Sequence, residues 1–332
     1  MKALLLILLV STQAFAIPEA NYNETFRNEV IPHFHFFHGD SFRNKQGMNL
    51  RYYSLTHPEF KKTLIIMPGR TEPAVKYAEV AYDLKDLRMN VFILDIQGQG
   101  ESDRLAKDPQ KGYVRYFNDY IVDLKQFIHE VVIPQTRGTE YSILSHSMGA
   151  AISAKYISVY RNHQIKKLIL NAPMFELNTT PYKEWIARLY SQALVLGGKG
   201  FDYAPGRGPY KPSEDTFEKN DVTHSKVRFE LNKNIFLDRP ELIVAGPTAR
   251  WVRESLITTK SAKNWGKSIK IPMMVFQAEL DQVVHMPRQA QFCDNAPQCE
   301  IHLFKGSFHE ILMEKDLIRD GAIAKIKKFL SK

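Results

Sequence analysis

Residues 141–150 read YSILSHSMGA, and this stretch decides the fold. Its first half has the branched apolar character of a buried strand, and the small residues that continue to position 156 form a helical pattern. A strand that turns at once into a helix can present a serine at its bend, provided that the residues two before and two after it are small. Gly149 meets this requirement, and Ser145 replaces the usual first glycine. The stretch therefore predicts Ser147 as a catalytic nucleophile.

Short apolar runs alternate with longer amphipathic segments on both sides of this bend. The runs lie at 63–67, 90–95, 141–145, 167–172, 271–277 and 300–304, with helical patterns at 73–88, 117–133 and 148–161. This alternation predicts a parallel sheet with helices on both faces. Residues 33–38 and 49–55 predict antiparallel entry strands, which brings the sheet to eight strands. Together with the serine bend, the pattern predicts the α/β class and the α/β-hydrolase fold.

The alternation stops between about residues 177 and 268. Helical patterns at 184–196 and 241–257 flank a loop at 198–212 that is rich in Gly, Pro and Tyr. Long insertions inside compact domains are usually functional. We therefore expect one hydrolase domain, residues 17–332, with a helical lid inserted at about 177–268.

The N-terminus has the pattern of a secretory signal peptide. Lys2 supplies a positive start, residues 3–10 are an unbroken apolar run, and Ala14-Phe15-Ala16 is an A-x-A cleavage site. A membrane span needs about 20 apolar residues, so this run is too short to be an anchor. We expect removal of residues 1–16, a mature chain that begins at Ile17, and a secreted or periplasmic protein.

Charge and cysteine content fit an exported protein that meets an anionic surface. The chain has 45 Lys and Arg against 36 Asp and Glu, a net charge of +9, which falls to +8 when Lys2 is removed. This excess favours an anionic partner, and without a nucleic-acid motif we expect peripheral contact with an anionic membrane surface and no nucleic acid. Export would allow Cys293 and Cys299 to pair, but their spacing leaves open either a disulfide or two separate buried thiols.

A serine nucleophile needs a histidine base that is oriented by a carboxylate, and in this fold the chain order is serine, acid, histidine. Asp281 follows the expected strand at 271–277, and His309 lies in the loop after the strand at 300–304. Both positions fall at the sheet edge where the partners of Ser147 should lie. The sequence therefore predicts the triad Ser147, Asp281 and His309.

Three nearby residues are alternatives to these partners. Glu279 precedes Asp281 by two residues and is a less well-placed acid. His285 and His302 are alternative bases, but His302 lies inside a strand and His285 precedes the final strand. Loop placement favours Asp281 and His309 over all three.

The developing oxyanion needs two backbone donors. One is expected from the N–H of Met148, directly after the nucleophile. The other is expected from Arg70 in the turn Pro68-Gly69-Arg70-Thr71, which follows the strand at 63–67.

Two further patterns are weaker than they look. The loop at 95–102 has two glycines, but the dinucleotide fingerprint requires a third at position 103, which is Asp103. His33 and His35 would share one strand face without a third ligand. We therefore expect no cofactor and no metal.

Beyond the serine bend, several motifs resemble the lysophospholipase L2 group, which is close to the monoglyceride lipases within the α/β-hydrolases. The similar segments cover most of the mature chain: Pro68-Gly69-Arg70, Lys76-Tyr77-Ala78-Glu79, Gly98-Gln99-Gly100, Phe117-Asn118-Asp119-Tyr120, His146-Ser147-Met148-Gly149, Ala172-Pro173-Met174-Phe175, Thr223-His224-Ser225, Gly246-Pro247-Thr248, Trp251-Val252-Arg253-Glu254-Ser255, His309-Glu310-Ile311-Leu312 and Glu314-Lys315-Asp316.

The resemblance implies hydrolysis of the remaining acyl ester of a lysophospholipid through an acyl-enzyme, without cofactor or metal, and acyl transfer to another phospholipid alcohol as a side activity. It implies the roles given above for Ser147, Asp281, His309, Arg70 and Met148. A monoacylglycerol lipase or general carboxylesterase would use the same residues. A lipid-binding protein that has lost catalysis is the alternative from another functional class.

Overall fold

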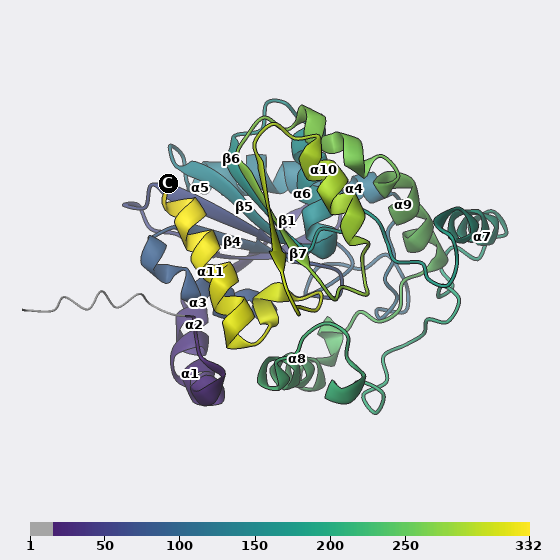
Figure 1. Ribbon diagram of the computed structural model, residues 1–332, viewed down its shortest axis with the longest axis horizontal. Helices are drawn as coiled ribbons and strands as arrows, with labels where there is room; N and C mark the ends of the chain where they lie inside the picture. Colours follow the sequence, from purple (N-terminus) through teal and green to yellow (C-terminus); the bar gives the residue numbers. More distant parts are fainter. Residues whose placement is uncertain (1–15) are drawn as a thin grey trace, which may run out of the picture.

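The computed structural model describes residues 16–332, so all of the expected leader except Ala16 lies outside the described residues. Within this range one sheet has the strand order β1-β2-β4-β3-β5-β6-β7-β8 (Figure 1). The strands are β1 (His38–Arg43), β2 (Asn49–Leu55), β3 (Lys62–Met67), β4 (Asn90–Leu94), β5 (Glu140–His146), β6 (Ile165–Asn171), β7 (Met273–Ala278) and β8 (Cys299–Phe304). β1 and β2 pair antiparallel to each other, β2 pairs antiparallel to β4, and all later pairings are parallel. The predicted mostly parallel eight-stranded sheet is confirmed.

Helices cover both faces of the sheet because successive side chains of each central strand point to opposite sides. In β3, Leu64 and Ile66 pack with α3 and α11, whereas Ile65 and Met67 pack with α4, α6 and α10. The helices are α1 (Tyr22–Thr25), α2 (Ile31–His35), α3 (Ala78–Asp83), α4 (Phe117–Gln126), α5 (Ile133–Gln135), α6 (Ser147–Val159), α7 (Glu184–Leu196), α8 (Lys226–Asp238), α9 (Ala249–Thr259), α10 (Met286–Asp294) and α11 (Asp316–Ser331). All four β3 side chains are essentially inaccessible to solvent, which explains the unbroken apolar run in the sequence.

The prediction of a strand at 33–38 is wrong. Residues 22–35 are helical: α1 and α2 are joined by the π-helical turn Phe26–Val30. Tyr22, Phe26 and Val30 recur every four residues and are buried together against Ala78, so helical spacing outweighs the short alternation around Phe34. The first strand begins at His38 instead.

Because α2 is a helix, its two histidines do not share a strand face. The His33 ring packs edge-on against Tyr82, with centroids 5.5 Å apart, and His35 is exposed. In the part of the chain that the structure describes, no group of three or more His, Cys, Asp or Glu side chains is arranged to hold a metal ion.

In the sequence, helices α7, α8 and α9 all come after β6 and before β7, within the segment expected to form a lid (Figure 1). The pattern at 184–196 matches α7, and the pattern at 241–257 overlaps α9, which begins only at Ala249. α8 was not expected from the sequence, because its apolar residues do not gather on one face: it buries Arg228 beside Phe229. None of the helices in residues 16–332 is long and apolar enough to cross a bilayer.

Cys293 and Cys299 are joined in a disulfide. The bond connects the end of α10 to the first residue of β8, with the two Cα atoms 5.4 Å apart. The bonded pair, rather than two separate thiols, closes the short connection that leads to the loop carrying His309.

Candidate active site

The bend between β5 and α6 places Ser147 in a strained backbone conformation. Its φ of 49° lies in the left-handed region, which non-glycine residues rarely adopt outside functional sites. Ser145 is accommodated before the bend because its hydroxyl donates to the carbonyl of Ile169 on β6, at 3.1 Å. After the bend, a Cβ at Gly149 would overlap the carbonyl oxygens of Met67 and Pro68. The small residues on either side of Ser147 are therefore set by contacts with the two neighbouring strands.

The three predicted triad side chains are hydrogen-bonded in series. His309 Nε2 lies 2.9 Å from Ser147 Oγ, and His309 Nδ1 lies 2.7 Å from Asp281 Oδ2. Asp281 follows β7 and His309 follows β8, so both reach the serine from the carboxyl ends of parallel strands. The arrangement can withdraw the serine proton and hold the resulting imidazolium.

Asp281 is held in its ionised form. Burial alone would raise its pKa, but the hydrogen bond and charge of His309 outweigh burial and lower it. The N–H groups of Val283 and Val284 also donate to Asp281 Oδ1, at 2.8 and 3.0 Å. With an ionised carboxylate opposite Nδ1, the proton of the neutral imidazole sits on Nδ1 and leaves Nε2 free to accept from Ser147.

The alternative acid and the two alternative bases make contacts outside the triad. Glu279 accepts the backbone N–H of Gly306 at 2.8 Å. His302 lies on β8, where its Nε2 is 3.6 Å from Glu300. His285 precedes α10, and its backbone N–H donates to the carbonyl of Glu176.

The turn after β3 is held from two sides. Glu72 accepts the N–H of Gly69, and the Gln99 amide donates to the Gly69 carbonyl at 2.7 Å. Gln99 also accepts the N–H of Thr71, a residue at φ 69°. The loop at 95–102 therefore contributes Gln99 to the site, a role that the sequence analysis did not identify.

The expected oxyanion donors occupy the bend after β3 and the first turn of α6. Met148 is the first residue after Ser147, and Arg70 lies between the anchored residues Gly69 and Thr71. The Arg70 guanidinium points toward the inserted segment, where it donates to the carbonyl of Ala245 and lies 5.3 Å from the Trp251 ring centre. Burial lowers the pKa of Arg70 to about 10.

A buried ionic network lies beneath the triad. Glu72 receives hydrogen bonds from His146, at 3.0 Å, and from Lys76, at 2.8 Å. Lys76 also pairs with Glu310 at 2.5 Å, and His146 Nε2 lies 3.3 Å from the carbonyl oxygen of His309. The network therefore joins three segments: the turn at 68–71, which carries the expected donor Arg70 and is called the oxyanion turn below, the bend at Ser147, and the loop that carries His309. The i, i+4 spacing of Glu72 and Lys76 was its only signal in the sequence.

The charged groups of this network shift one another's pKa values. Burial would raise the pKa of Glu72, but His146 and Lys76 lower it well below its ordinary value. Burial would lower the pKa of His146, but Glu72 raises it. Both shifts favour the charged forms of the pair, so the pair stabilises the fold while both groups are ionised.

A cavity of about 230 Å³ lies beside the oxyanion turn. The core side of the cavity is formed by Thr71, Pro73, Lys76 and Glu310. The side formed by the inserted segment has six apolar or aromatic residues, Tyr210, Val222, Phe229, Ile235, Phe236 and Val244, and four polar or charged ones, Asp215, Thr223, Asn232 and Lys233. No triad residue lines this cavity, but two of its lining residues are direct neighbours of site residues in the sequence: Thr71 follows Arg70, and Glu310 follows His309.

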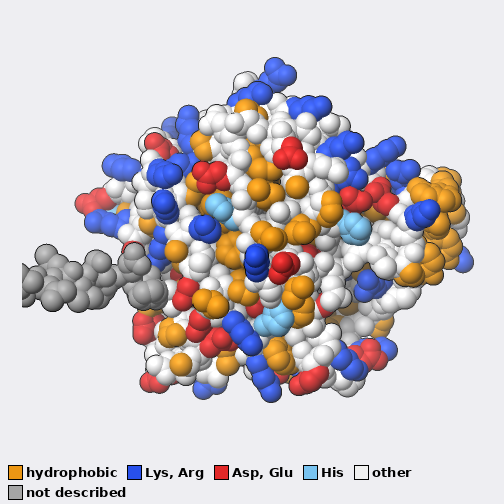
Figure 2. Space-filling view, viewed as in Figure 1, with side chains coloured by type: hydrophobic (Ala, Val, Ile, Leu, Met, Phe, Trp, Pro, Cys, Tyr) orange, Lys and Arg blue, Asp and Glu red, His pale blue; other side chains and the backbone are white. Residues whose placement is uncertain are grey.

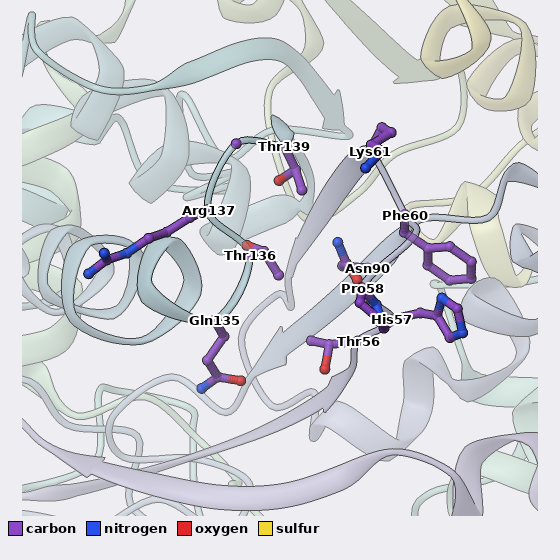
Figure 3. A pocket seen from close by; sticks show the side chains of 11 residues that line it. Thr56, His57, Pro58, Phe60, Lys61, Asn90, Gln135, Thr136, Arg137 and Thr139 are labelled. Atoms are coloured by element: carbon purple, nitrogen blue, oxygen red, sulfur yellow. The ribbon is translucent and has the colours of Figure 1, made fainter.

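A second hollow, of about 290 Å³, lies at the opposite end of the parallel strands, where β3, β4 and β5 begin (Figure 3). It is lined by residues that precede or begin strands, among them Lys61, Asn90 and Thr139. Ser147 follows the opposite end of β5, a strand of seven residues, so the two sites are about 20 Å apart. This hollow contains no member of the triad.

Comparison with known proteins places this geometry among hydrolases. The family model for serine aminopeptidase, S33, matches residues 58–316. Lysophospholipase L2 of Escherichia coli strain K12 is 33% identical over 298 residues, covering 88% of this chain and 86% of that protein. A probable lysophospholipase L2 of Haemophilus influenzae is 30% identical, covering 95% and 99%. A soluble variant of Saccharomyces cerevisiae monoglyceride lipase, solved with a substrate analogue, has the same fold, with a TM-score of 0.69, 16% identity, and coverage of 88% of this chain and 94% of that one.

Gly149→Ala tests the close packing at the bend. The added methyl group has to displace the backbone of Met67 and Pro68, so the free energy of unfolding should fall by about 3 kcal/mol. Turnover of a short p-nitrophenyl ester should fall at least about tenfold, because Pro68 begins the oxyanion turn. Urea unfolding and ester kinetics measure both effects. Gly208→Ala is the matched control, because a Cβ there meets nothing within 4 Å; equal behaviour of the two variants would contradict the packing argument.

Glu72→Gln tests the buried ionic network through its pH dependence. The contribution of Glu72, whose pKa is lowered, is present above its ordinary value of 4.5 and is lost as pH falls through the folded value. The contribution of His146, whose pKa is raised, is present below its ordinary value of 6.5 and is lost as pH rises through the folded value. The variant should therefore lose most stability, about 3 kcal/mol, between about pH 4.5 and 6.5, and less at alkaline pH.

Urea unfolding across this pH range measures the difference between the variant and the wild type. Glu214→Gln is the control, because Glu214 forms an exposed ion pair with Lys211 and its loss should change stability little at any pH. If Glu72→Gln lowers the free energy of unfolding by the same amount from pH 5 to 9, His146 is not the ionic partner of Glu72.

Proposed function

The chain belongs to the serine aminopeptidase, S33 family and to the lysophospholipase L2 group of α/β-hydrolases, and from this premise we propose that it hydrolyses the remaining acyl ester of lysophospholipids. The observation that carries the proposal is the hydrogen-bonded series from Ser147 through His309 to Asp281. Two lysophospholipase L2 relatives, each at least 30% identical over most of their length, support the choice of substrate.

In the proposed reaction, Ser147 Oγ attacks the ester carbonyl while His309 Nε2 takes its proton. The backbone N–H groups of Arg70 and Met148 donate to the oxyanion of the tetrahedral intermediate. His309 then protonates the departing glycerophosphodiester oxygen, which leaves an acyl-enzyme on Ser147. Water, deprotonated by His309, releases the fatty acid and restores the serine. Asp281 stays ionised and keeps the imidazole oriented throughout.

The cavity beside the oxyanion turn supports an acyl-chain substrate. The side formed by the inserted segment has six apolar or aromatic residues, and the sequence neighbours of Arg70 and His309 also line the cavity. A monoacylglycerol or a simple carboxylic ester would contact the same apolar side of the cavity and the same triad. A monoacylglycerol lipase or general carboxylesterase is therefore the second candidate, and only the head group separates it from the first.

Substrate turnover with and without the nucleophile tests both the enzyme and its substrate. The wild type should hydrolyse lysophosphatidylcholine with a higher kcat/KM than monoacylglycerol or a short p-nitrophenyl ester. Ser147→Ala should lower kcat on all three by about 10⁴-fold or more, because the hydroxyl forms the acyl-enzyme. A fluorophosphonate probe should label the wild type and not this variant.

Each alternative predicts a different result in this experiment. Turnover of the neutral esters alone would replace the phospholipid assignment with the lipase or carboxylesterase. A folded wild-type protein that the probe does not label would indicate a lipid-binding protein without catalysis. Ser158→Ala is the matched control, since that hydroxyl lies near the end of the same helix and bonds only to the Lys155 carbonyl.

We further propose that the protein is secreted or periplasmic and meets anionic membranes through α7. This helix buries only Ser191, and it exposes Trp185 and Leu189 by 54% and 60%. With Tyr182, Ile186, Tyr190 and Leu196, they form an apolar patch at the rim of the molecule (Figure 2). Exposed patches of this kind mark interaction surfaces, and Trp and Tyr favour the interfacial region of bilayers. Lys183 and Lys199 lie exposed at its two ends and suit an anionic surface.

Replacing the centre of this patch tests the membrane contact. Trp185→Ser with Leu189→Ser should lower binding to phosphatidylglycerol vesicles at least about tenfold, because each side chain loses apolar burial in the lipid. Turnover of vesicle-borne lysophospholipid should fall with it, whereas turnover of a soluble ester should not. Leu317→Ser is the control: Leu317 is 91% exposed but lies on α11. Vesicle sedimentation measures binding, and equal binding by all forms would contradict the role of α7.

A further inference from the structure

Ile17, the expected first residue of the mature chain, is buried. Only 4% of its surface is exposed, although chain termini usually lie in solvent. Its backbone nitrogen lies 3.3 Å from Asp83 Oδ1, and its carbonyl accepts from Arg228 Nη2 at 2.7 Å. Both ends of this residue are therefore held by charged side chains.

These side chains belong to a group that we call the Asp83 cluster. It contains three carboxylates and two guanidinium groups: Glu79, Asp83, Asp316, Arg228 and Arg319. Arg319 pairs with Asp83 at 2.5 Å and with Glu79 at 3.1 Å, and Arg228 pairs with Glu79 at 3.0 Å. All members except Asp316 are almost completely buried.

The cluster has one more carboxylate than guanidinium groups, a formal charge of −1. Its buried members, Glu79 and Asp83 with Arg228 and Arg319, balance one another, and the excess charge lies with Asp316, whose side chain is 34% exposed. Asp320 lies close enough to interact with Arg319 and Arg228 and adds to the negative side. Burial and the charge of Glu79 raise the pKa of Asp83, although Arg319 and the backbone N–H of Ile17 oppose the shift.

Cleavage of the expected leader would supply a third positive charge. Hydrolysis between Ala16 and Ile17 by an export signal peptidase adds one water: the new carboxylate leaves with the leader, and the Ile17 nitrogen becomes a primary amine. Such amines have a pKa of about 7.7–8.0 and bind a proton at neutral pH. We propose that the α-ammonium of Ile17 is bound in the Asp83 cluster as its third cation.

This assignment places cleavage before folding. Ala16 and Ile17 are each only 4% exposed, so a protease could not reach the bond between them in the folded protein. An uncleaved chain has at this position an amide N–H, with one hydrogen to donate and no charge. The Ile17 ammonium of the mature chain has three hydrogens to donate and a full positive charge at the same place. The carboxylates of the Asp83 cluster are therefore better paired in the mature form than in the uncleaved form.

The bound N-terminus also joins three elements that are distant in sequence. Asp83 ends α3, Arg228 lies on α8, and the N–H of Glu19 donates to Asp316 on α11 at 2.9 Å. Glu19 in turn accepts from Ser225, directly before α8, at 2.5 Å. Loss of the ammonium should therefore loosen the attachment of α8 to the core as well as the N-terminus itself.

The test compares two exported forms of the full chain. One carries the native leader; the other has Gly-Ser inserted between Ala16 and Ile17, so that cleavage by the same peptidase leaves the amine two residues before the cluster. Intact mass should show the first form beginning at Ile17. Its Tm should exceed that of the extended form by about 5 °C, because the ammonium adds a charge-assisted hydrogen bond to Asp83 that the neutral amide of the extended form cannot supply.

Asp83→Asn identifies the partner of the amine. In this background the difference in Tm between the two forms should shrink to about 1 °C, because the carboxylate that pairs with the ammonium is gone. Asp86→Asn is the matched control: Asp86 follows three residues later, its side chain is 54% exposed, and the full difference should remain. An equal difference in all three backgrounds would overturn the assignment.

Amine labelling gives an independent readout if Asp83→Asn does not fold. At pH 7.5 an N-hydroxysuccinimide ester should label the α-amine of the native form at least tenfold more slowly than that of the Gly-Ser form, and equally fast after denaturation. Mass spectrometry of the N-terminal peptide measures both rates. Rapid labelling of native Ile17, or a mature chain that begins at another residue, would exclude the proposed site.

Discussion

The contact between Gly149 and the carbonyls of Met67 and Pro68 is the constraint on which the candidate site depends. It brings the first turn of α6 against the end of β3, so the residue after Ser147 and the turn that holds Arg70 lie on one side of the same reacting position. A side chain at position 149 would separate the two segments that carry the expected oxyanion donors, Arg70 and Met148. Ser147 lies at this bend in a strained backbone conformation, with a φ of 49°, and the buried strands on either side maintain it.

One short segment then connects this site to the rest of the fold. Glu72, Lys76, Glu79 and Asp83 follow one another at intervals of four, three and four residues, and all four side chains are nearly inaccessible to solvent. The first two belong to the network beneath the triad, and the last two belong to the Asp83 cluster. Glu72 lies just before the helical segment, whereas Lys76 lies on the 3-10 helical turn Ala74–Tyr77 and Glu79 and Asp83 lie on α3, so their spacing places these three along one side of it. The side that would normally be apolar is therefore ionic, and every charge on it requires a partner from elsewhere in the chain.

This arrangement explains which features could be predicted from the sequence. Strands such as β3 are buried on both faces and have a local apolar signature, and the order of serine, acid and histidine along the chain identified side chains that meet at the carboxyl edge. The network around Glu72 has no such signature, because its partners, His146 and Glu310, are distant in sequence. α8 was missed for the same reason: Arg228 is buried by ion pairs with Glu79 and Asp316, which no periodicity of apolar residues reveals. The prediction of a strand at 33–38 is wrong because the apolar spacing of four residues that begins at Tyr22 outweighs the short alternation around Phe34.

The two ways in which the inserted helices are attached indicate different roles for them. α8 is held to the core by the buried guanidinium of Arg228, whose pairs with Glu79 and Asp316 fix it against α3 and α11. Its neighbour Phe229 lines the cavity, so the position of that wall follows from the ion pairs. α7 packs against α9 and buries only Ser191, and its apolar side chains face outward. Moving those side chains into lipid would break no buried ion pair, because α7 contributes none. The inserted segment can therefore present an apolar surface through α7 while α8 keeps the cavity wall in place beside the oxyanion turn.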